Sequence, residues 1–143
     1  MNRPKIKIVT DATCHRTGVA AIGKSAGVAF FYDETGRQIR SEEFILGETF
    51  PYAAECETIL RALDIASELT RGSVEVWTDS EILVRHMNGT YRLRSKYSKS
   101  YFDKLKQLQL RFDSVHFFHH SRATRLGKAA HSAAAAVYLR VHA

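Results

Sequence analysis

The stretch VWTDSEILVRHMNGTY, residues Val76–Tyr91, carries the pattern that decides the fold. An apolar strand runs into an Asp-Ser pair, a short apolar helix follows, and Asn-Gly closes the helix. Asp or Ser at such a junction is an ordinary helix N-cap, because its side-chain oxygen accepts an otherwise unpaired backbone N–H. By itself the stretch predicts a capped strand-to-helix turn, so the rest of the chain must decide whether Asp79 also has a chemical role.

Strand and helix patterns alternate on both sides of this stretch. Runs of β-branched and aromatic residues predict strands, and apolar residues three or four apart predict helices. The predicted strands are 5–13, two within 27–46 around a turn at Asp33–Gly36, 73–79 and 114–120. The predicted helices are 53–69, 80–89, 98–112 and 126–141, and residues 14–26 are expected to form a loop. The order β-β-β-α-β-α-α-β-α predicts an α/β fold, a mixed sheet flanked by helices.

Length and composition set the broad class. A chain of 143 residues with 45% hydrophobic and 25% charged residues predicts a single globular domain over residues 1–143. No apolar run is long enough for a membrane span, and the N-terminus lacks the apolar region of a signal peptide. Cys14 and Cys56 have no framework or metal-type spacing, so we expect free thiols in a reducing compartment, the cytoplasm. We also expect the protein to be a monomer.

Positive charge is concentrated after the Asn-Gly turn. The net charge is +6, and residues Tyr91–Lys106 are rich in Lys and Arg, with Tyr and Phe among them. Most such runs are solvated surfaces. The functional alternative is a surface that follows phosphates, where cations displace the counterions of a nucleic acid.

Three acidic residues are predicted to converge. Asp11 and Asp79 follow strands whose carboxyl ends meet if those strands are parallel neighbours, and Glu55 lies on the helix stripe that should face the sheet. Each has a simpler explanation, a turn for Asp11, a helix cap for Asp79 and a helix-dipole contact for Glu55. Three carboxylates at one place repel one another unless a cation lies between them, and oxygen ligands favour Mg²⁺ or Mn²⁺.

Taken in order, these motifs resemble type 1 ribonuclease H over nearly the whole chain. The strand-D-S-helix stretch with its basic tail is the most specific match. The segments that carry the resemblance are IVTDATC (8–14), AAECETILRAL (53–63), VWTDSEILVRHMNGTYRLRSK (76–96), HHSR (119–122) and AAHSAAA (129–135). The resemblance implies a ribonuclease H-like fold, a three-stranded antiparallel meander plus two parallel strands in one five-stranded mixed sheet.

Several positions depart from the family's pattern. Phe50, Pro51 and Tyr52 stand before the glutamate where the family usually has Asn and Thr. The family's fourth carboxylate falls on His131 if the preceding loop is two residues longer than usual, and on Ala129 otherwise. The glycine-rich loop after the first aspartate is altered, and the basic helix that some members insert is missing.

The resemblance implies hydrolysis of the RNA strand of RNA/DNA hybrids, leaving 5′-phosphate products. Two Mg²⁺ or Mn²⁺ ions would be held by Asp11, which bridges them, by Glu55 and Asp79 on either side, and by His131 as the fourth ligand. His119 would assist proton transfer or product release, with His120 a nearly equal candidate for that role.

Polar and basic residues around the acids are expected to bind the nucleic acid. They are Thr13, Ser80, Asn88, Tyr91, Arg92, Arg94 and Lys96. Three alternatives stay open at this point. The chain could be a catalytically weakened module that binds hybrids without cutting them, another metal-dependent nuclease of the same fold, or an interaction domain without nucleic acid.

Overall fold

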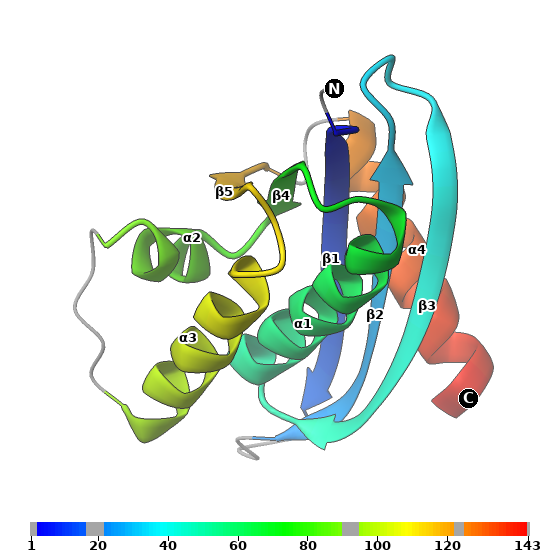
Figure 1. The fold of residues 1–143 in the computed structure, drawn as a ribbon. Coiled ribbons are helices and arrows are strands. Elements are labelled where there is room, and N and C mark those ends of the chain that lie inside the picture. The colour runs from blue at the N-terminus through cyan, green and yellow to red at the C-terminus, as the bar shows by residue number, and fades with distance from the viewer. Residues whose placement is uncertain (1–2, 17–21, 90–94, 122–124, 143) are drawn as a thin grey trace.

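The structure is a computed structural model that describes residues 3–16, 22–89, 95–121 and 125–142. Within these described residues, five strands and four helices follow one another in the predicted order (Figure 1). They are β1 (Ile6–Arg16), β2 (Gly23–Tyr32), β3 (Gln38–Thr49), α1 (Pro51–Leu69), β4 (Ser73–Thr78), α2 (Glu81–Met87), α3 (Lys96–Gln109), β5 (Ser114–His119) and α4 (Arg125–His142).

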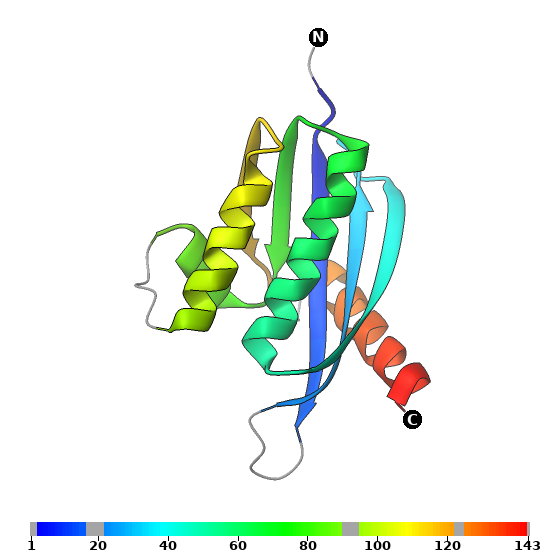
Figure 2. The same ribbon diagram turned by 60° about the horizontal axis from the view of Figure 1, so that its bottom comes forward.

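The strands form one mixed sheet in the order β3-β2-β1-β4-β5. β1 pairs antiparallel with β2, and β2 antiparallel with β3, whereas β4 runs parallel to both β1 and β5. Helices α1 and α3 cover one face of this sheet and α4 covers the other (Figures 1 and 2). The predicted five-stranded mixed sheet, a meander plus two parallel strands, is confirmed.

Alternation along β1 builds a separate apolar layer on each face. Ile8 points into the layer under α1 and α3, and Val9 points into the layer under α4. In the second layer the buried residues Ala130 and Ala134 let α4 lie close to the sheet. On the other face α1 approaches β2 so closely that a Cβ at Gly27 would collide with the Thr58 hydroxyl.

The predicted loop over residues 14–26 is wrong for most of its length. β1 continues to Arg16 and β2 begins at Gly23, so Cys14 pairs with Ser25 and Thr13 with Ala26. The small and polar residues there lack a strand-like side-chain pattern, but antiparallel pairing uses backbone groups that every non-proline residue carries. The long hairpin therefore continues beyond the layers that its apolar residues fill.

All four helices differ from their predicted bounds by one to three residues at one or both ends. α1 begins at Pro51, two residues early, because proline suits the first helical turn. α3 begins at Lys96, where the Ser95 side chain accepts a hydrogen bond from the Ser98 backbone N–H at 3.0 Å, and ends at Gln109. No helix among the described residues combines the length and apolar character that a bilayer crossing requires.

Candidate functional site

Asp11 lies in the middle of β1, not at its end as the sequence suggested. The parallel pairing of β1 with β4 stops at Val9 and Trp77, while pairing with β2 continues to Arg16. Beyond Val9 the β4 side of β1 is therefore open, and Asp79, the residue after β4, occupies the start of that opening. The expected meeting of Asp11 and Asp79 is confirmed, although the edge that brings them together is the end of β4.

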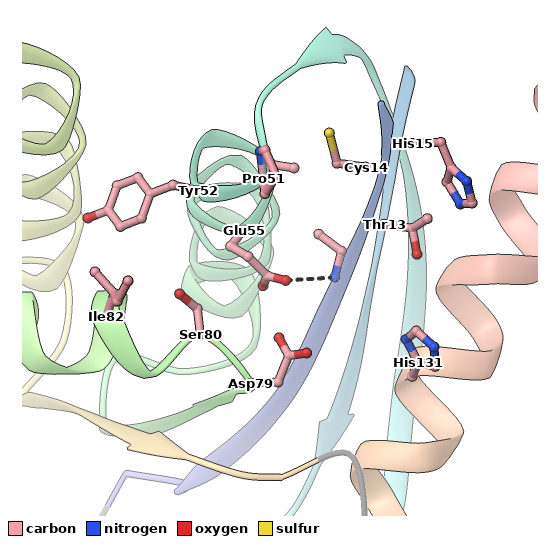
Figure 3. A pocket seen from close by; sticks show the side chains of 12 residues that line it. Thr13, Cys14, His15, Pro51, Tyr52, Glu55, Asp79, Ser80, Ile82 and His131 are labelled. Atoms are coloured by element: carbon pink, nitrogen blue, oxygen red, sulfur yellow. Dashed lines mark hydrogen bonds between the residues drawn. The ribbon is translucent and has the colours of Figure 1, made fainter. Parts of the chain in front are cut away.

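Glu55 reaches the same place from α1. Its Oε1 accepts a hydrogen bond from the Ala12 backbone N–H at 3.2 Å (Figure 3), and its Oε2 accepts one from the Thr78 hydroxyl at 3.3 Å. The side chain is almost fully buried. The close contact between Gly27 and Thr58, one helical turn further along α1, holds the helix at the distance that these bonds require.

The three acids form a compact cluster. One ligand oxygen each from Asp11, Glu55 and Asp79 lies within 4.8 Å of the other two. Asp11 is fully buried and Asp79 partly exposed. Burial raises the pKa of Glu55 well above its ordinary value, and the neighbouring charges of Asp79 and then Asp11 raise it further. Such a donor set fits a divalent cation, which removes this repulsion and accepts hard oxygen ligands.

Glu55→Gln should stabilise the metal-free protein. Glu in the unfolded chain has a pKa of about 4.3, and in the folded protein the pKa of Glu55 is higher. The folded state therefore loses stability relative to the unfolded state as the pH rises from about 4.3 through the folded-state pKa. We therefore expect Glu55→Gln to have a higher Tm than the wild type in EDTA, by roughly 2–4 °C for each kcal/mol of relieved repulsion. The gain in Tm should be larger at pH 8 than at pH 5. Glu68→Gln, an exposed change on the same helix, is the control and should leave Tm nearly unchanged. An equal gain at both pH values would contradict the charge explanation.

His131 contacts the cluster through Asp11. Its Nδ1 lies 3.1 Å from Asp11 Oδ2, and the imidazole is 42% exposed whereas the Asp11 side chain is 1% exposed. Ala129, the alternative position, faces solvent. Within the described residues, His131 is outside the set of mutually close ligand atoms. Its place at the site is thus established, while its role as a metal ligand stays a prediction.

The two neighbouring histidines at the end of β5 differ in environment. His120 is buried, with Nε2 3.3 Å from the Thr10 carbonyl oxygen and its backbone N–H donating to Thr78 O at 2.9 Å. It therefore links the middle of β1, next to Asp11, to the end of β4, next to Asp79. His119 is exposed and lies beside Glu81, whose pKa is lowered chiefly by Arg85 and slightly by His119. Of the two, His119 is the one with access to a substrate.

A cleft of about 540 Å³ opens above the acids. Pro51, Tyr52 and Ile82 lie on one side of it, and Thr13, His15 and His131 lie on the other (Figure 3). No sequence motif predicted a site role for Cys14, His15 or Ile82, and Pro51 and Tyr52 stood out in the sequence only as departures from a family pattern. Helical spacing could have found Tyr52, because it precedes Glu55 by three residues.

The predicted nucleic-acid contacts divide into three groups. Thr13 and Ser80 line the cleft, although Ser80 also caps α2 by accepting a 3.4 Å bond from Leu83 N–H. Asn88 lies outside the cleft and donates to Phe117 O at 3.4 Å, and Lys96 is exposed at the start of α3. The predicted contacts Tyr91, Arg92 and Arg94 lie outside the described residues.

Fold and site together define a ribonuclease H-like protein with an acidic centre. A family model described as "Reverse transcriptase-like" matches residues 10–137, so the chain belongs to that family. The resemblance to type 1 ribonuclease H that the motifs indicated is confirmed.

Solved structures of ribonucleases H1 share this fold. LC11-RNase H1, isolated from compost by a metagenomic approach, is 26% identical, with 100% of both chains covered and a TM-score of 0.84. LC11-RNase H1 in complex with RNA/DNA hybrid is 27% identical over 82% of this chain and 86% of the other, with a TM-score of 0.72. RNase H1 from the archaeon Halobacterium salinarum is 17% identical, with 96% of this chain and 99% of the other covered and a TM-score of 0.84. At this identity the match shows a shared fold. No curated protein sequence matches the chain.

Proposed function

We propose that this protein is a ribonuclease H, an endonuclease that hydrolyses the RNA strand of RNA/DNA hybrids with the help of two divalent ions. The observation that carries the proposal is the cluster formed by the buried Asp11 and Glu55 and the partly exposed Asp79 at the base of an open cleft. The family match and the likeness to a ribonuclease H1 solved with an RNA/DNA hybrid support it. We further propose that the chain acts as one domain and as a monomer.

Asp11, Glu55 and Asp79 would hold the ions, Mg²⁺ or Mn²⁺, with His131 as an additional ligand beside Asp11. When bound, the pair of ions would activate water and stabilise the leaving oxygen of the phosphodiester. The protein keeps this donor set in place before substrate arrives, because Ala12 N–H and the Thr78 hydroxyl orient both oxygens of Glu55. The Ser80 N–H in turn donates to the Thr78 hydroxyl at 3.2 Å, which links the Glu55 carboxylate to the start of α2.

Other residues of the site act on substrate or protons. Glu55 would lie near the ribose, where the 2′-hydroxyl distinguishes RNA from DNA. His119, exposed at the end of β5, would transfer a proton or help release product. Thr13 lines the cleft and would contact the substrate, and its buried hydroxyl has no hydrogen-bond partner among the described residues.

The proposal is tested by incubating the protein with a labelled RNA/DNA hybrid, duplex RNA and duplex DNA, each with Mg²⁺, Mn²⁺ or EDTA. We expect metal-dependent cleavage of the hybrid's RNA strand, with 5′-phosphate ends. Binding without cleavage in either metal would instead identify a weakened ribonuclease H-like binding module. Preferred cleavage of either homoduplex would identify another nuclease of this fold.

Removing the basic charges after α2 should weaken binding and leave chemistry intact. For the triple variant Arg92→Ala, Arg94→Ala and Lys96→Ala we expect a higher KM, an unchanged kcat, and a salt dependence of log Kd that is shallower by roughly 2–3. The reason is that fewer counterions are released when fewer phosphates are neutralised. KM, kcat and Kd would be measured between 50 and 200 mM salt.

The matched control for that variant removes the same amount of charge at the end of the sheet that lies away from the cleft. Arg3→Ala, Arg37→Ala and Arg71→Ala alter three exposed residues away from the cleft. The control should change KM much less than the test variant does. A large fall in kcat at saturating substrate in the test variant would show that the basic residues take part in chemistry.

A further inference from the structure

One wall of the cleft is apolar, although it stands next to the acids. The wall consists of Pro51, Tyr52 and Ile82. Ile82 is 54% exposed, although large aliphatic side chains are usually buried. Pro51 has no backbone N–H to offer a ligand. The opposite wall, in contrast, carries the polar side chains of Thr13, His15 and His131.

The one polar atom of this apolar wall is already engaged. Tyr52 Oη and His86 Nδ1 lie 2.9 Å apart and share a hydrogen bond, and the two rings meet edge to face at 5.7 Å. Burial lowers the pKa of His86 and raises that of Tyr52, so both groups stay neutral near pH 7. The hydrogen bond fixes the tyrosine ring and commits its hydroxyl, which leaves the ring itself to contact a ligand.

The wall is positioned to contact a nucleotide beside the reacting phosphate. Tyr52 precedes Glu55 by three residues on α1, so the two residues are neighbours on the helix surface, and both line the cleft. In a duplex the bases are stacked on one another, and the groove exposes sugars and base edges to a protein. An apolar surface without free hydrogen-bonding groups is complementary to the carbon face of a sugar and does not recognise its hydroxyl.

We propose that Pro51, Tyr52 and Ile82 form a sugar-packing subsite that holds a nucleotide next to the scissile phosphate without reading its 2′-hydroxyl. The inference rests on the proposed function, because it needs a nucleic acid in the cleft. Tyr52 is a positioning residue in this scheme. Its ring contributes to binding, and the Tyr52–His86 hydrogen bond keeps the ring in place.

Steady-state kinetics on one hybrid sequence test the subsite. Tyr52→Ala should raise KM about tenfold and change kcat less than twofold, because the lost contact is present before and during the reaction. Tyr52→Phe keeps the ring and should stay within about threefold of the wild-type KM. Ile82→Ala alters an exposed residue and should fold normally, so its expected several-fold rise in KM tests the wall even if Tyr52→Ala misfolds.

Leu110→Ala is the matched control, since Leu110 is also an exposed aliphatic residue but lies outside the cleft. It should leave KM unchanged. Hybrid affinity measured by fluorescence anisotropy in EDTA should follow the same order as KM, which provides a readout independent of cleavage.

A substrate series tests the claim about the 2′-hydroxyl. Hybrids carrying a single 2′-deoxynucleotide on either side of the cleavage site are compared with the all-ribose hybrid, for wild type and Tyr52→Ala. We expect the two changes to have additive effects on log KM. If the effect of Tyr52→Ala disappears on a deoxy-substituted hybrid, Tyr52 reads the hydroxyl and the inference is overturned.

Failure of the inference is distinct from failure of the proposed function. A wild-type protein that neither binds nor cuts the hybrid would reject both. A wild-type protein that cuts the hybrid while Tyr52→Ala and Ile82→Ala keep its KM would reject only the subsite.

Discussion

Asp11→Asn and Asp79→Asn are each expected to reduce hybrid cleavage on the order of a thousandfold. Each change replaces a carboxylate by an amide of the same shape, so the cluster keeps only two of its three carboxyl groups. The cation site is thereby weakened while the packing around it is kept. Rates would be measured under single-turnover conditions with Mg²⁺ and with Mn²⁺, beside circular dichroism to check the fold.

The aspartate variants also make a prediction that needs no substrate. Relief of repulsion in the cluster should raise Tm in EDTA, and the stabilisation that divalent metal gives the wild type should shrink, because ligand binding to the folded state is what produces it. Asp113→Asn changes an exposed aspartate far from the cleft and is the matched control. Near-wild-type cleavage by either Asp11→Asn or Asp79→Asn would reject this cluster as the catalytic site.

The sheet and the acidic cluster could be predicted because both depend on local strand and helix patterns, and each pattern allows only one arrangement of its residues. Runs of β-branched and aromatic residues in 73–79 and 5–13 indicated two strands, and parallel neighbours place their carboxyl ends together. The inward position of Glu55 could be predicted from helical spacing, because residues 55, 59, 62 and 66 fall on one side of a helix. In the structure all four are buried. These inferences needed only the periodicity of each element and the order of elements along the chain.

Other parts of the site depend on contacts between distant residues. The Tyr52–His86 hydrogen bond joins residues 34 positions apart, and no local pattern indicates it. Strand alternation would have placed His119 on the same side as the buried Phe117. Instead His120, just beyond the end of β5, is the buried histidine and contacts the Thr78 and Thr10 carbonyl oxygens. The continuation of the β1–β2 hairpin was missed for a related reason, since backbone pairing leaves no side-chain pattern.

His131 should make the metal preference of this protein depend on one side chain. If its imidazole is a ligand, the site has one negative charge fewer than a four-carboxylate site and includes a nitrogen donor, which suits Mn²⁺ better than Mg²⁺. We therefore expect the wild type to be more active in Mn²⁺. His131→Asp should raise Mg²⁺-supported activity about tenfold, and His131→Ala should lower activity in both metals.

The contact between His131 Nδ1 and Asp11 Oδ2 suggests an alternative role, in which the histidine only orients the aspartate and does not bind metal. Titration calorimetry distinguishes a ligand role from an orienting role. Loss of a nitrogen ligand should lower the affinity for Mn²⁺ more than the affinity for Mg²⁺, whereas loss of an orienting hydrogen bond should lower both affinities alike. Ser132→Ala, an exposed change at the next position of α4, should leave both affinities unchanged. If His131→Ala keeps the wild-type ratio of Mn²⁺ to Mg²⁺ affinity, His131 is not a ligand, and the site holds its ions with Asp11, Glu55 and Asp79.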